Sequence, residues 1–367
     1  MTKKIRLGLI GATVATTWAS RSHLPALLAS KDFELVAVCT TRAETAEAVR
    51  RKVGARLAFH DYREMVASPE IDAVAVVVRV PSHYAPAKAA IEAGKHVYCE
   101  WPLGKTTAEG EELAALAKAR GVKTAVGLQS RVDPTLGYVK ELIESGYVGE
   151  ILACTVCSMR DGVLERPSSR TWQRDASLAA NTFTIGAGHT IDALRFVAGD
   201  FARLTALVST QVNQWYETDT KKTLEVTSPD NVLVSGQLVS GAVASVHVGT
   251  IPWAGNEYRM EIYGRAGTLV VTGANTPQFG DLRLQGAQGS NTLADLPVPQ
   301  RLVLVDPGTP QGDSYNVGQM YCNFAHTIRS GERLHPDFDT AVVLHRFLDS
   351  IKLASDTGRQ VELKSGD

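Results

Sequence analysis

The residues that most constrain the fold form the apolar run Ile71–Pro81, IDAVAVVVRVP. A strand with one exposed face alternates apolar and polar residues, whereas this run is almost continuously apolar, which is typical of a strand buried on both faces of a parallel sheet. Parallel neighbours need long crossover connections, usually helices. The run therefore predicts strand–helix repeats before and after it.

The first part of the chain carries such repeats, and right-handed crossovers then place helices on both sides of a parallel sheet. We expect an N-terminal doubly wound (Rossmann) domain over residues 1–128, with an α/β fold. Its expected strands span 4–11, 34–41, 56–61, 71–81, 95–104 and 123–129, and its expected helices span 43–54, 83–94 and 107–121.

The pattern changes after that point, because polar alternation along the strands is typical of an antiparallel sheet with one exposed face. We expect an α+β domain over residues 129–367 with a large, mostly antiparallel open sheet, and a final helix at about 339–357 packing back on the first domain. Expected strands span 150–159, 203–212, 231–250, 258–273 and 301–306, and further helices span 134–146 and 188–200.

Composition narrows the class of protein. The formal net charge of −1 gives no reason to expect a nucleic-acid partner, and no apolar run is long enough to span a bilayer. Lys3, Lys4 and Arg6 precede a short apolar run, which is compatible with a signal peptide; the following glycine and helical pattern favour a strand and turn instead.

Cysteine usage points to a reducing compartment. Five cysteines in a long chain argue against a disulfide framework. Cys154 and Cys157 form a CxxC, but the surrounding segment is an expected strand, on which positions three apart point to opposite faces. We therefore expect two small strand residues, no metal site and a cytoplasmic location.

A single glycine marks the turn after the first strand. Gly11 supplies the tight turn that a dinucleotide-binding fold needs, but Thr13 and Thr16 occupy the positions of the second and third glycines of the usual fingerprint. Thr13 adds bulk near the expected phosphate, although its hydroxyl can donate a hydrogen bond. We expect Gly11, Thr13 and Val14 to contact the coenzyme.

The end of the second strand bears on coenzyme choice. An NAD enzyme usually has a carboxylate here for the ribose hydroxyls, whereas this chain has Thr40, Thr41 and Arg42. Two hydroxyls and a guanidinium suit a 2′-phosphate, so NADP is favoured over NAD. The alternative is that Arg42 starts a solvated helix.

Four longer motifs are spread along the chain: VPSHYAPAKAAIEAGKHVYCEWPLG (80–104), GLQSRVDP (127–134), GHTIDAL (188–194) and YGRAGTL (263–269). With these motifs the chain resembles, over essentially its whole length, the glucose–fructose oxidoreductase and inositol dehydrogenase (Gfo/Idh/MocA) family. Four shorter features are Trp18-Ala19, Glu100-Trp101, ERP (165–167) and LHR (344–346). In these the sequence is similar to a subgroup of that family that includes the fungal galactose-regulon repressor.

The resemblance assigns site residues and exposes two substitutions. Trp101 replaces the lysine of the family's Glu-Lys-Pro motif, and Ile185 stands where the family often has an aspartate four residues before the histidine. His189 remains as the expected proton partner, with Asp192 on the same helix face. Trp101 either stacks on a ligand or packs the cleft.

The resemblance also implies further contacts. Pro81, His83, Glu100 and Gln129 are expected near the coenzyme; the equal alternative for His83 is that it starts the next helix and packs. Trp101 and His189 are expected at the substrate together with three residues that have structural alternatives: Arg131, Arg166 and Trp172.

The motifs and the family resemblance are compatible with three functions. The first is an NAD(P)-dependent oxidoreductase that transfers hydride to or from a sugar, cyclitol or related alcohol or carbonyl. The others are a non-catalytic NADP-binding regulator and a redox-neutral lyase or glycosidase using bound coenzyme. We expect a small-molecule substrate, no membrane partner, and a homodimer or homotetramer formed through the C-terminal sheet.

Overall fold

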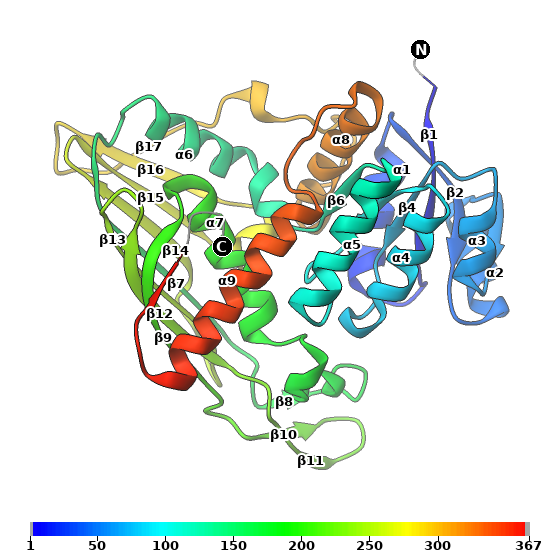
Figure 1. Cartoon of the computed structure of the whole chain (residues 1–367), viewed down its shortest axis with the longest axis horizontal. Coiled ribbons are helices and arrows are strands. Elements are labelled where there is room, and N and C mark those ends of the chain that lie inside the picture. Colours follow the sequence, from blue (N-terminus) through cyan, green and yellow to red (C-terminus); the bar gives the residue numbers. More distant parts are fainter. Residues whose placement is uncertain (1–2, 364–367) are drawn as a thin grey trace. The chain divides into compact units, whose positions relative to one another are not determined.

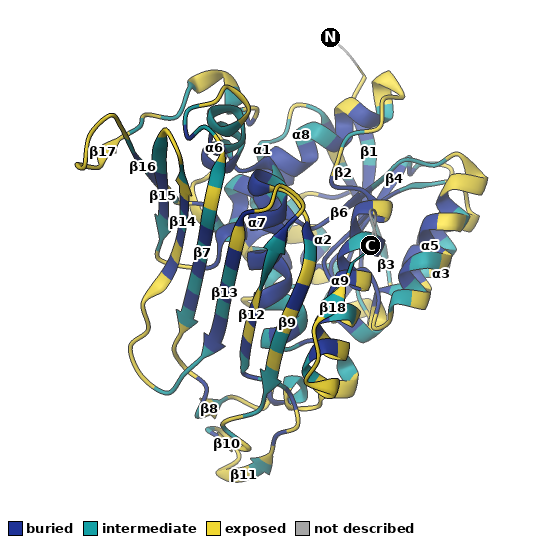
Figure 2. Cartoon of the chain, turned by 60° about the vertical axis from the view of Figure 1, so that its left-hand side comes forward, coloured by how far each residue is buried: buried dark blue, intermediate teal, exposed yellow. Residues whose placement is uncertain are grey.

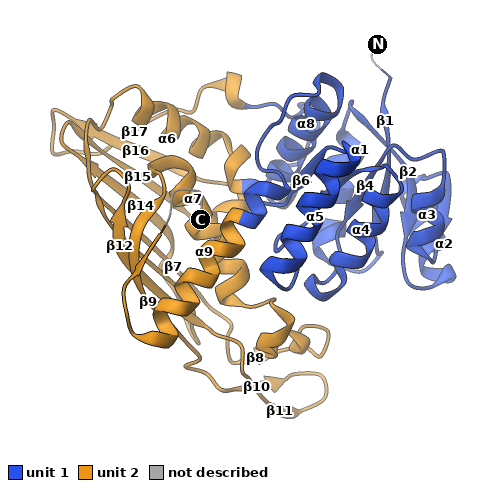
Figure 3. Ribbon diagram, in the orientation of Figure 1, with its two compact units in different colours: residues 1–129, 303–342 blue, residues 130–302, 343–367 orange. Residues whose placement is uncertain are grey.

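The computed structural model describes residues 3–363, which form two compact units (Figures 1 and 3). Unit 1 consists of the chain up to Gln129 together with residues 303–342. Unit 2 consists of residues 130–302 and the chain from Val343 onward. Residues 303–342 thus belong to unit 1, whereas the sequence pattern assigned the whole stretch after residue 128 to the second domain.

Unit 1 is built on a six-stranded parallel sheet in the order β3-β2-β1-β4-β5-β6. The apolar run Ile71–Pro81 contributes β4 (Ala73–Val76) to the middle of this sheet, and all four residues of β4 are inaccessible to solvent, as burial on both faces requires. The strands are β1 (Ile5–Ile10), β2 (Phe33–Cys39), β3 (Leu57–Phe59), β4 (Ala73–Val76), β5 (His96–Cys99) and β6 (Thr124–Val126).

Residues at both ends of α5 (Thr107–Arg120) show how a helix of unit 1 begins and ends. Thr106 accepts a hydrogen bond from the backbone of Glu109 at the start of α5, and Gly121, with φ of +66°, ends that helix in the left-handed region. The helices are α1 (Leu24–Ala29), α2 (Ala43–Val53), α3 (Tyr62–Ala67), α4 (Tyr84–Glu92), α5 (Thr107–Arg120) and α8 (Tyr315–Ser330).

The expected strand at 301–306 is wrong. A short 3₁₀ turn, Gln300–Leu302, is found there, and the next residues approach α8. The Gln319 side chain accepts hydrogen bonds from the backbones of Leu304 (2.6 Å) and Val305 (2.9 Å). Because a side chain on α8 satisfies these amides, the segment does not need a neighbouring strand.

Unit 2 is built on a nine-stranded, mostly antiparallel sheet in the order β17-β16-β15-β14-β7-β13-β12-β9-β18, in which only the β7–β13 pair is parallel among the described strands. Its strands are β7 (Ile151–Arg160), β9 (Phe201–Ser209), β12 (Asn231–Leu238), β13 (Val243–Thr250), β14 (Glu257–Gly264), β15 (Gly267–Gly273), β16 (Arg283–Gln288), β17 (Ala294–Asp295) and β18 (Val361–Glu362).

One face of this sheet is covered and the other is open. Val232 and Val234 on β12 are buried, whereas Leu233 between them is 42% exposed. The same alternation runs along the neighbouring strands (Figure 2). On β7 it places Cys154 inside and Cys157 on the opposite face, as the strand pattern predicted.

A small three-stranded sheet, not expected from the sequence, completes unit 2: β8 (Glu165–Arg166), β10 (Gln214–Glu217) and β11 (Lys222–Glu225). The unit also contains α6 (Pro134–Glu144) and α7 (Gly188–Ala198), which packs against β7. The last helix, α9 (Phe338–Thr357), begins in unit 1 and continues in unit 2. None of the helices within residues 3–363 is long and apolar enough to cross a membrane.

Candidate functional site

The carboxyl ends of β1, β2, β4 and β5 meet at one edge of the parallel sheet in unit 1. The chain turns to opposite sides after β1 and β4, which makes this edge the place where open α/β sheets bind ligands. Gly11 follows β1 with φ of +95°, and a Cβ there would lie 2.1 Å from the Val77 carbonyl oxygen. Only glycine fits this turn.

Helical structure does not begin directly after the Gly11 turn. A π-helical turn, Ala19–His23, leads into α1, and the intervening chain forms bends. Side-chain hydroxyls hold these bends, because Thr13 accepts from the backbone of Ala15 (3.2 Å) and Ser20 accepts from the backbone of Thr17 (2.9 Å). Val14 is 50% exposed at this edge.

Of the three residues that follow β2, Thr40 has a structural role, whereas Thr41 and Arg42 face solvent. The Thr40 hydroxyl donates to the Arg42 carbonyl (2.8 Å) and contacts the Thr45 hydroxyl (2.6 Å), so it fixes the start of α2. Thr41 and Arg42 are exposed. Their hydroxyl and guanidinium are therefore the groups of this set that face solvent.

Glu100 follows β5 and is the centre of a buried hydrogen-bond network. His23 lies 2.9 Å from Glu100 Oε1, and its other ring nitrogen lies 2.8 Å from the Tyr321 hydroxyl. Tyr98 donates to the same carboxylate (3.0 Å), and Gln129 Nε2 donates to both carboxylate oxygens (3.0 and 3.1 Å). The network fixes the carboxylate at the base of the ligand-binding edge.

The network also determines the protonation of its tyrosines. Burial, and then the charge of Glu100, raises the pKa of both Tyr98 and Tyr321, so both remain hydroxyl donors at neutral pH. The Gln129 Oε1 atom is buried and has no hydrogen-bond partner within residues 3–363. It is thus an acceptor that the described chain leaves unused.

His83 and Trp101 lie in the interior. His83 is 1% exposed, with its ring nitrogens 2.7 Å from the Pro102 carbonyl and 3.0 Å from the Val78 carbonyl. Burial lowers the pKa of His83, and the ring connects the loop after β4 to the loop after β5. Trp101 is 4% exposed, which supports the packing alternative for this side chain. Pro81, in a 3₁₀ turn, is half-buried.

In unit 2, His189 is the second residue of α7 and is 4% exposed. Asp192, one turn further along, is fully buried and accepts three hydrogen bonds of 2.7–3.0 Å from Arg131. Arg131 thus binds a carboxylate of its own unit, which supports its structural alternative. Ile185 lies in the π-helical turn Thr182–Ala187 before α7 and offers no acid or base.

Arg166 and Trp172 lie in the irregular segment between β7 and α7. The Arg166 guanidinium stacks on the buried Trp215 ring, with its Cζ 4.1 Å from the ring centroid, and donates to Gln173 (2.9 Å). Trp172 lies in the 3₁₀ turn Thr171–Arg174 and is half-buried.

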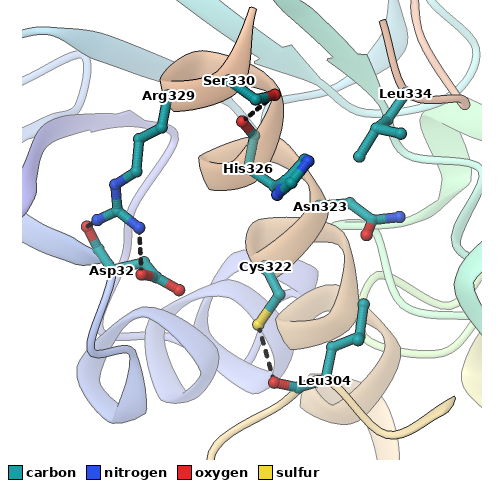
Figure 4. Close-up of a pocket in the computed structure, with 8 residues that line it drawn as sticks. All are labelled: Asp32, Leu304, Cys322, Asn323, His326, Arg329, Ser330 and Leu334. Atoms are coloured by element: carbon teal, nitrogen blue, oxygen red, sulfur yellow. Dashed lines mark hydrogen bonds and ion pairs between the residues drawn. The ribbon is translucent and has the colours of Figure 1, made fainter. Parts of the chain in front are cut away.

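A groove of about 640 Å³ lies elsewhere in unit 1, along α8 (Figure 4). Arg329 and Asp32 form an ion pair of 2.5 Å on one side of it, and Cys322 lies on the other. Burial raises the pKa of the Cys322 thiol to about 11, so the thiol is protonated at neutral pH. The groove contains no residue that the sequence predicted for the site.

Sequence reasoning missed His23, Tyr98 and Tyr321, although they hold Glu100. His23 and Tyr321 are 298 positions apart and belong to no shared motif. Neither spacing nor composition signals such a pair, because the fold alone brings α8 to the strand edge.

The fold and these sites define a two-part protein with an NAD(P)-binding Rossmann domain and a second α+β domain. Residues 5–128 match the Gfo/Idh/MocA description "Oxidoreductase family, NAD-binding Rossmann fold", and residues 134–273 match "Gal80p, C-terminal domain". The chain belongs to the Gfo/Idh/MocA oxidoreductase family.

Two curated relatives are both named dehydrogenases. The chain is 29% identical to dehydrogenase aclE of Aspergillus oryzae, over 98% of both chains. It is 30% identical to inositol 2-dehydrogenase 3 of Saccharopolyspora erythraea, over 72% of each.

Solved structures share the fold at lower identity. A super-repressor mutant of Gal80p from Saccharomyces cerevisiae has a TM-score of 0.88 at 22% identity, with 99% of this chain and 100% of that chain covered. Levoglucosan dehydrogenase in complex with NADH and L-sorbose has a TM-score of 0.84 at 22% identity, with the same coverage.

Proposed function

We propose that the protein is an NADP(H)-dependent oxidoreductase that interconverts an alcohol and a carbonyl on a sugar, a cyclitol or a related polyol. The observation that carries this proposal is the ligand-binding edge of unit 1, where the Gly11 turn, exposed Arg42 and anchored Glu100 follow β1, β2 and β5 at the same edge of the parallel sheet. Family membership supports it, since relatives include dehydrogenases.

The residues at this edge fit a phosphorylated nicotinamide coenzyme. Arg42 and Thr41 offer a cation and a hydroxyl donor for a 2′-phosphate. Asp61, two residues after β3, accepts a hydrogen bond from the backbone of Arg63 and caps α3. Gln129 Oε1 is an unused acceptor next to Glu100. In this proposal Gly11, Thr13, Val14, Thr40, Pro81, His83 and Trp101 complete the coenzyme contacts.

The bound coenzyme supplies the hydride-transfer chemistry. His189 takes the hydroxyl proton during oxidation and returns it during reduction, because imidazole is the side chain that does both near neutral pH. Arg131 holds Asp192 and thereby positions the helix that carries His189. With Trp101 in place of lysine, orientation and this imidazole are left to lower the barrier.

A second candidate function is a coenzyme-binding regulator without turnover. It is favoured by the two substitutions, Trp101 for lysine and Ile185 for a carboxylate, and by the match of residues 134–273 to the Gal80p C-terminal domain. A third candidate function is a redox-neutral lyase or glycosidase that uses bound coenzyme, and the activity assay distinguishes it from the other two.

We further propose that the protein is cytoplasmic and forms a homodimer or homotetramer through the open face of the nine-stranded sheet. Leu207, Leu233 and Val243 on this face are 58%, 42% and 63% exposed. Apolar side chains gathered on one sheet face commonly mark an interface. Light scattering on the purified protein measures its oligomeric state. A monomer at micromolar concentration would contradict the proposed homodimer or homotetramer.

The activity is tested with purified protein, NADP⁺ or NADPH, and a panel of sugars, cyclitols and small carbonyls, by following reduced-nicotinamide absorbance. Turnover that His189→Ala abolishes, with coenzyme affinity unchanged, supports the oxidoreductase. Tight coenzyme binding without turnover supports the regulator. A product change without a net absorbance change supports the redox-neutral enzyme and contradicts the proposal.

A further inference from the structure

We propose that the ligand of unit 2 carries an oxyanion, a carboxylate or a phosphate, that binds Arg160, Arg166 and Arg170. This inference rests on the proposed function and names its substrate class: a sugar acid or sugar phosphate in place of a neutral polyol.

The three arginines lie within residues 160–170 of unit 2, on three successive local elements. Arg160 ends β7, Arg166 lies on β8, and Arg170 precedes the 3₁₀ turn Thr171–Arg174. Burial, and then the positive charges of Arg170 and Arg160, lower the pKa of Arg166 to about 10. Burial and the charge of Arg170 lower the pKa of Arg160 in the same way. The guanidinium groups therefore act on one another electrostatically.

Their positive charge is not neutralised by the fold. Within residues 3–363, none of the three arginines forms an ion pair. Asp161 is next to Arg160 in the chain, and its negative charge raises the pKa of the Arg160 guanidinium. In the described part of the chain, Asp161 and Arg160 do not form an ion pair with each other. Arg166 is half-buried, whereas Arg160 and Arg170 are exposed beside it. An oxyanion placed among the three cations offsets the repulsion that the two exposed charges exert on Arg166.

Arg166 is oriented before any ligand arrives. Its planar group is held by the Trp215 ring and by Gln173, and its Nε atom is buried with no hydrogen-bond partner among the described residues. Arginine binds oxyanions through parallel N–H donors, and a fixed group loses little entropy on binding. Arg160 is also held against an aromatic ring, with its Cζ 5.7 Å from the Phe279 ring centroid.

The cluster lies beside the segment that leads to His189. Arg160 pairs in register with Thr250, whose hydroxyl lies 2.8 Å from that of Thr182. Thr182 begins the helical segment that continues into α7, and seven residues of helix span about 10 Å. A ligand of sugar size bound by the arginine side chains can therefore reach toward His189. Figure 2 shows β8 and β10 near the carboxyl ends of β7 and β13.

Binding to the full-length protein tests the inference without relying on turnover. Isothermal titration compares D-gluconate, D-glucuronate and D-glucose 6-phosphate with D-glucose, each with and without saturating NADP⁺. We expect at least one of the three anions to bind at least about 10-fold more tightly than D-glucose, because hydrogen bonds to charged groups are worth more than neutral ones. Preference for the acids identifies a carboxylate ligand, and preference for the ester identifies a phosphate ligand.

Variants assign the effect to the cluster. We expect the double variant Arg160→Gln/Arg170→Gln to lose about 10-fold or more in anion affinity, and Arg166→Lys to lose part of it, because the cation stays but the fork is lost. Arg174→Gln is the matched control, since Arg174 lies in the same segment but donates to the Glu225 carbonyl. Thermal unfolding verifies that each variant is folded.

Equal affinity for all four probes overturns the inference, as does unchanged anion binding by the double variant. If the anions bind and no substrate is turned over, the oxidoreductase proposal fails and the inference stands. If a neutral polyol is turned over and no anion binds, the inference fails and the oxidoreductase proposal stands.

Discussion

Arg131 and Asp192 form a bidentate ion pair within unit 2, with Arg131 Nε and Nη2 2.7–3.0 Å from the two carboxylate oxygens. The Asp192 side chain is 1% exposed and the Arg131 side chain 20%. The pair joins the turn Gln129–Val132 to α7, the helix that carries His189. It thus gives each charge a partner and fixes the helix.

Replacing Arg131 with methionine leaves the Asp192 carboxylate buried and unpaired. We expect the free energy of unfolding to fall by about 3 kcal/mol, the usual cost of breaking a buried pair. Urea titration of the variant measures this change. Arg203→Met is the control, because Arg203 is exposed on β9 and donates to Gln237; we expect it to change stability by no more than about 0.5 kcal/mol. Equal small losses in both variants contradict the prediction.

Replacing His189 with alanine removes the proposed proton partner. We expect kcat to fall by about 10²- to 10⁴-fold, the usual range for general acid–base catalysis, with coenzyme affinity unchanged. Steady-state kinetics together with fluorescence titration of NADPH separates the two quantities. A loss of coenzyme affinity that accounts for the whole loss of rate would show that His189 acts on binding.

Replacing Arg42 with alanine tests coenzyme choice. We expect the Kd for NADPH to rise about 10-fold or more, since a charge-assisted hydrogen bond is lost, with a smaller change for NADH. Arg51→Ala is the control, because Arg51 lies on the same helix, α2, and pairs with Glu47. Equal losses for the two coenzymes remove the proposed 2′-phosphate contact.

His345 on α9 is expected to make the stability of the protein depend on pH. Burial lowers the pKa of His345 to about 4, below the unperturbed value of about 6.5. The unfolded chain therefore binds a proton in this interval that the folded protein does not. We expect the contribution of this residue to the free energy of unfolding to decrease by about 3 kcal/mol as the pH falls from about 6.5 to about 4.

Denaturant titrations over that pH interval, on wild type and His345→Gln, measure this contribution. The variant is expected to show a shallower dependence of unfolding free energy on pH, because glutamine does not titrate. Identical slopes for the two proteins would assign the acid sensitivity to other groups.

The sequence predicted the parts of the fold that depend on local pattern. The apolar run containing β4 predicted the parallel sheet, and polar alternation predicted the open antiparallel sheet. Gly11 was predicted at the turn it occupies. These features depend on periodicity or on a single backbone angle, which neighbouring residues alone determine.

Features that depend on distant residues could not be predicted in this way. Nothing near Val305 shows that the Gln319 side chain satisfies its backbone amide, so an apolar segment was expected to be a strand. Nothing near Arg131 shows that its partner is Asp192, so the sequence favours a structural role only slightly over a ligand-binding one. Tertiary contacts decide both cases.

The return of residues 303–342 to unit 1 has a consequence for recombination between relatives. Tyr321 and Phe324 of α8 pack against the rings of Phe33 and Tyr98, and their ring centroids lie 5.2–6.3 Å apart. A chimera that exchanges only the first 129 residues would combine aromatic rings from two parents in one core. A viable crossover must transfer the α8 segment as well, so the smallest unit of exchange is discontinuous in the gene.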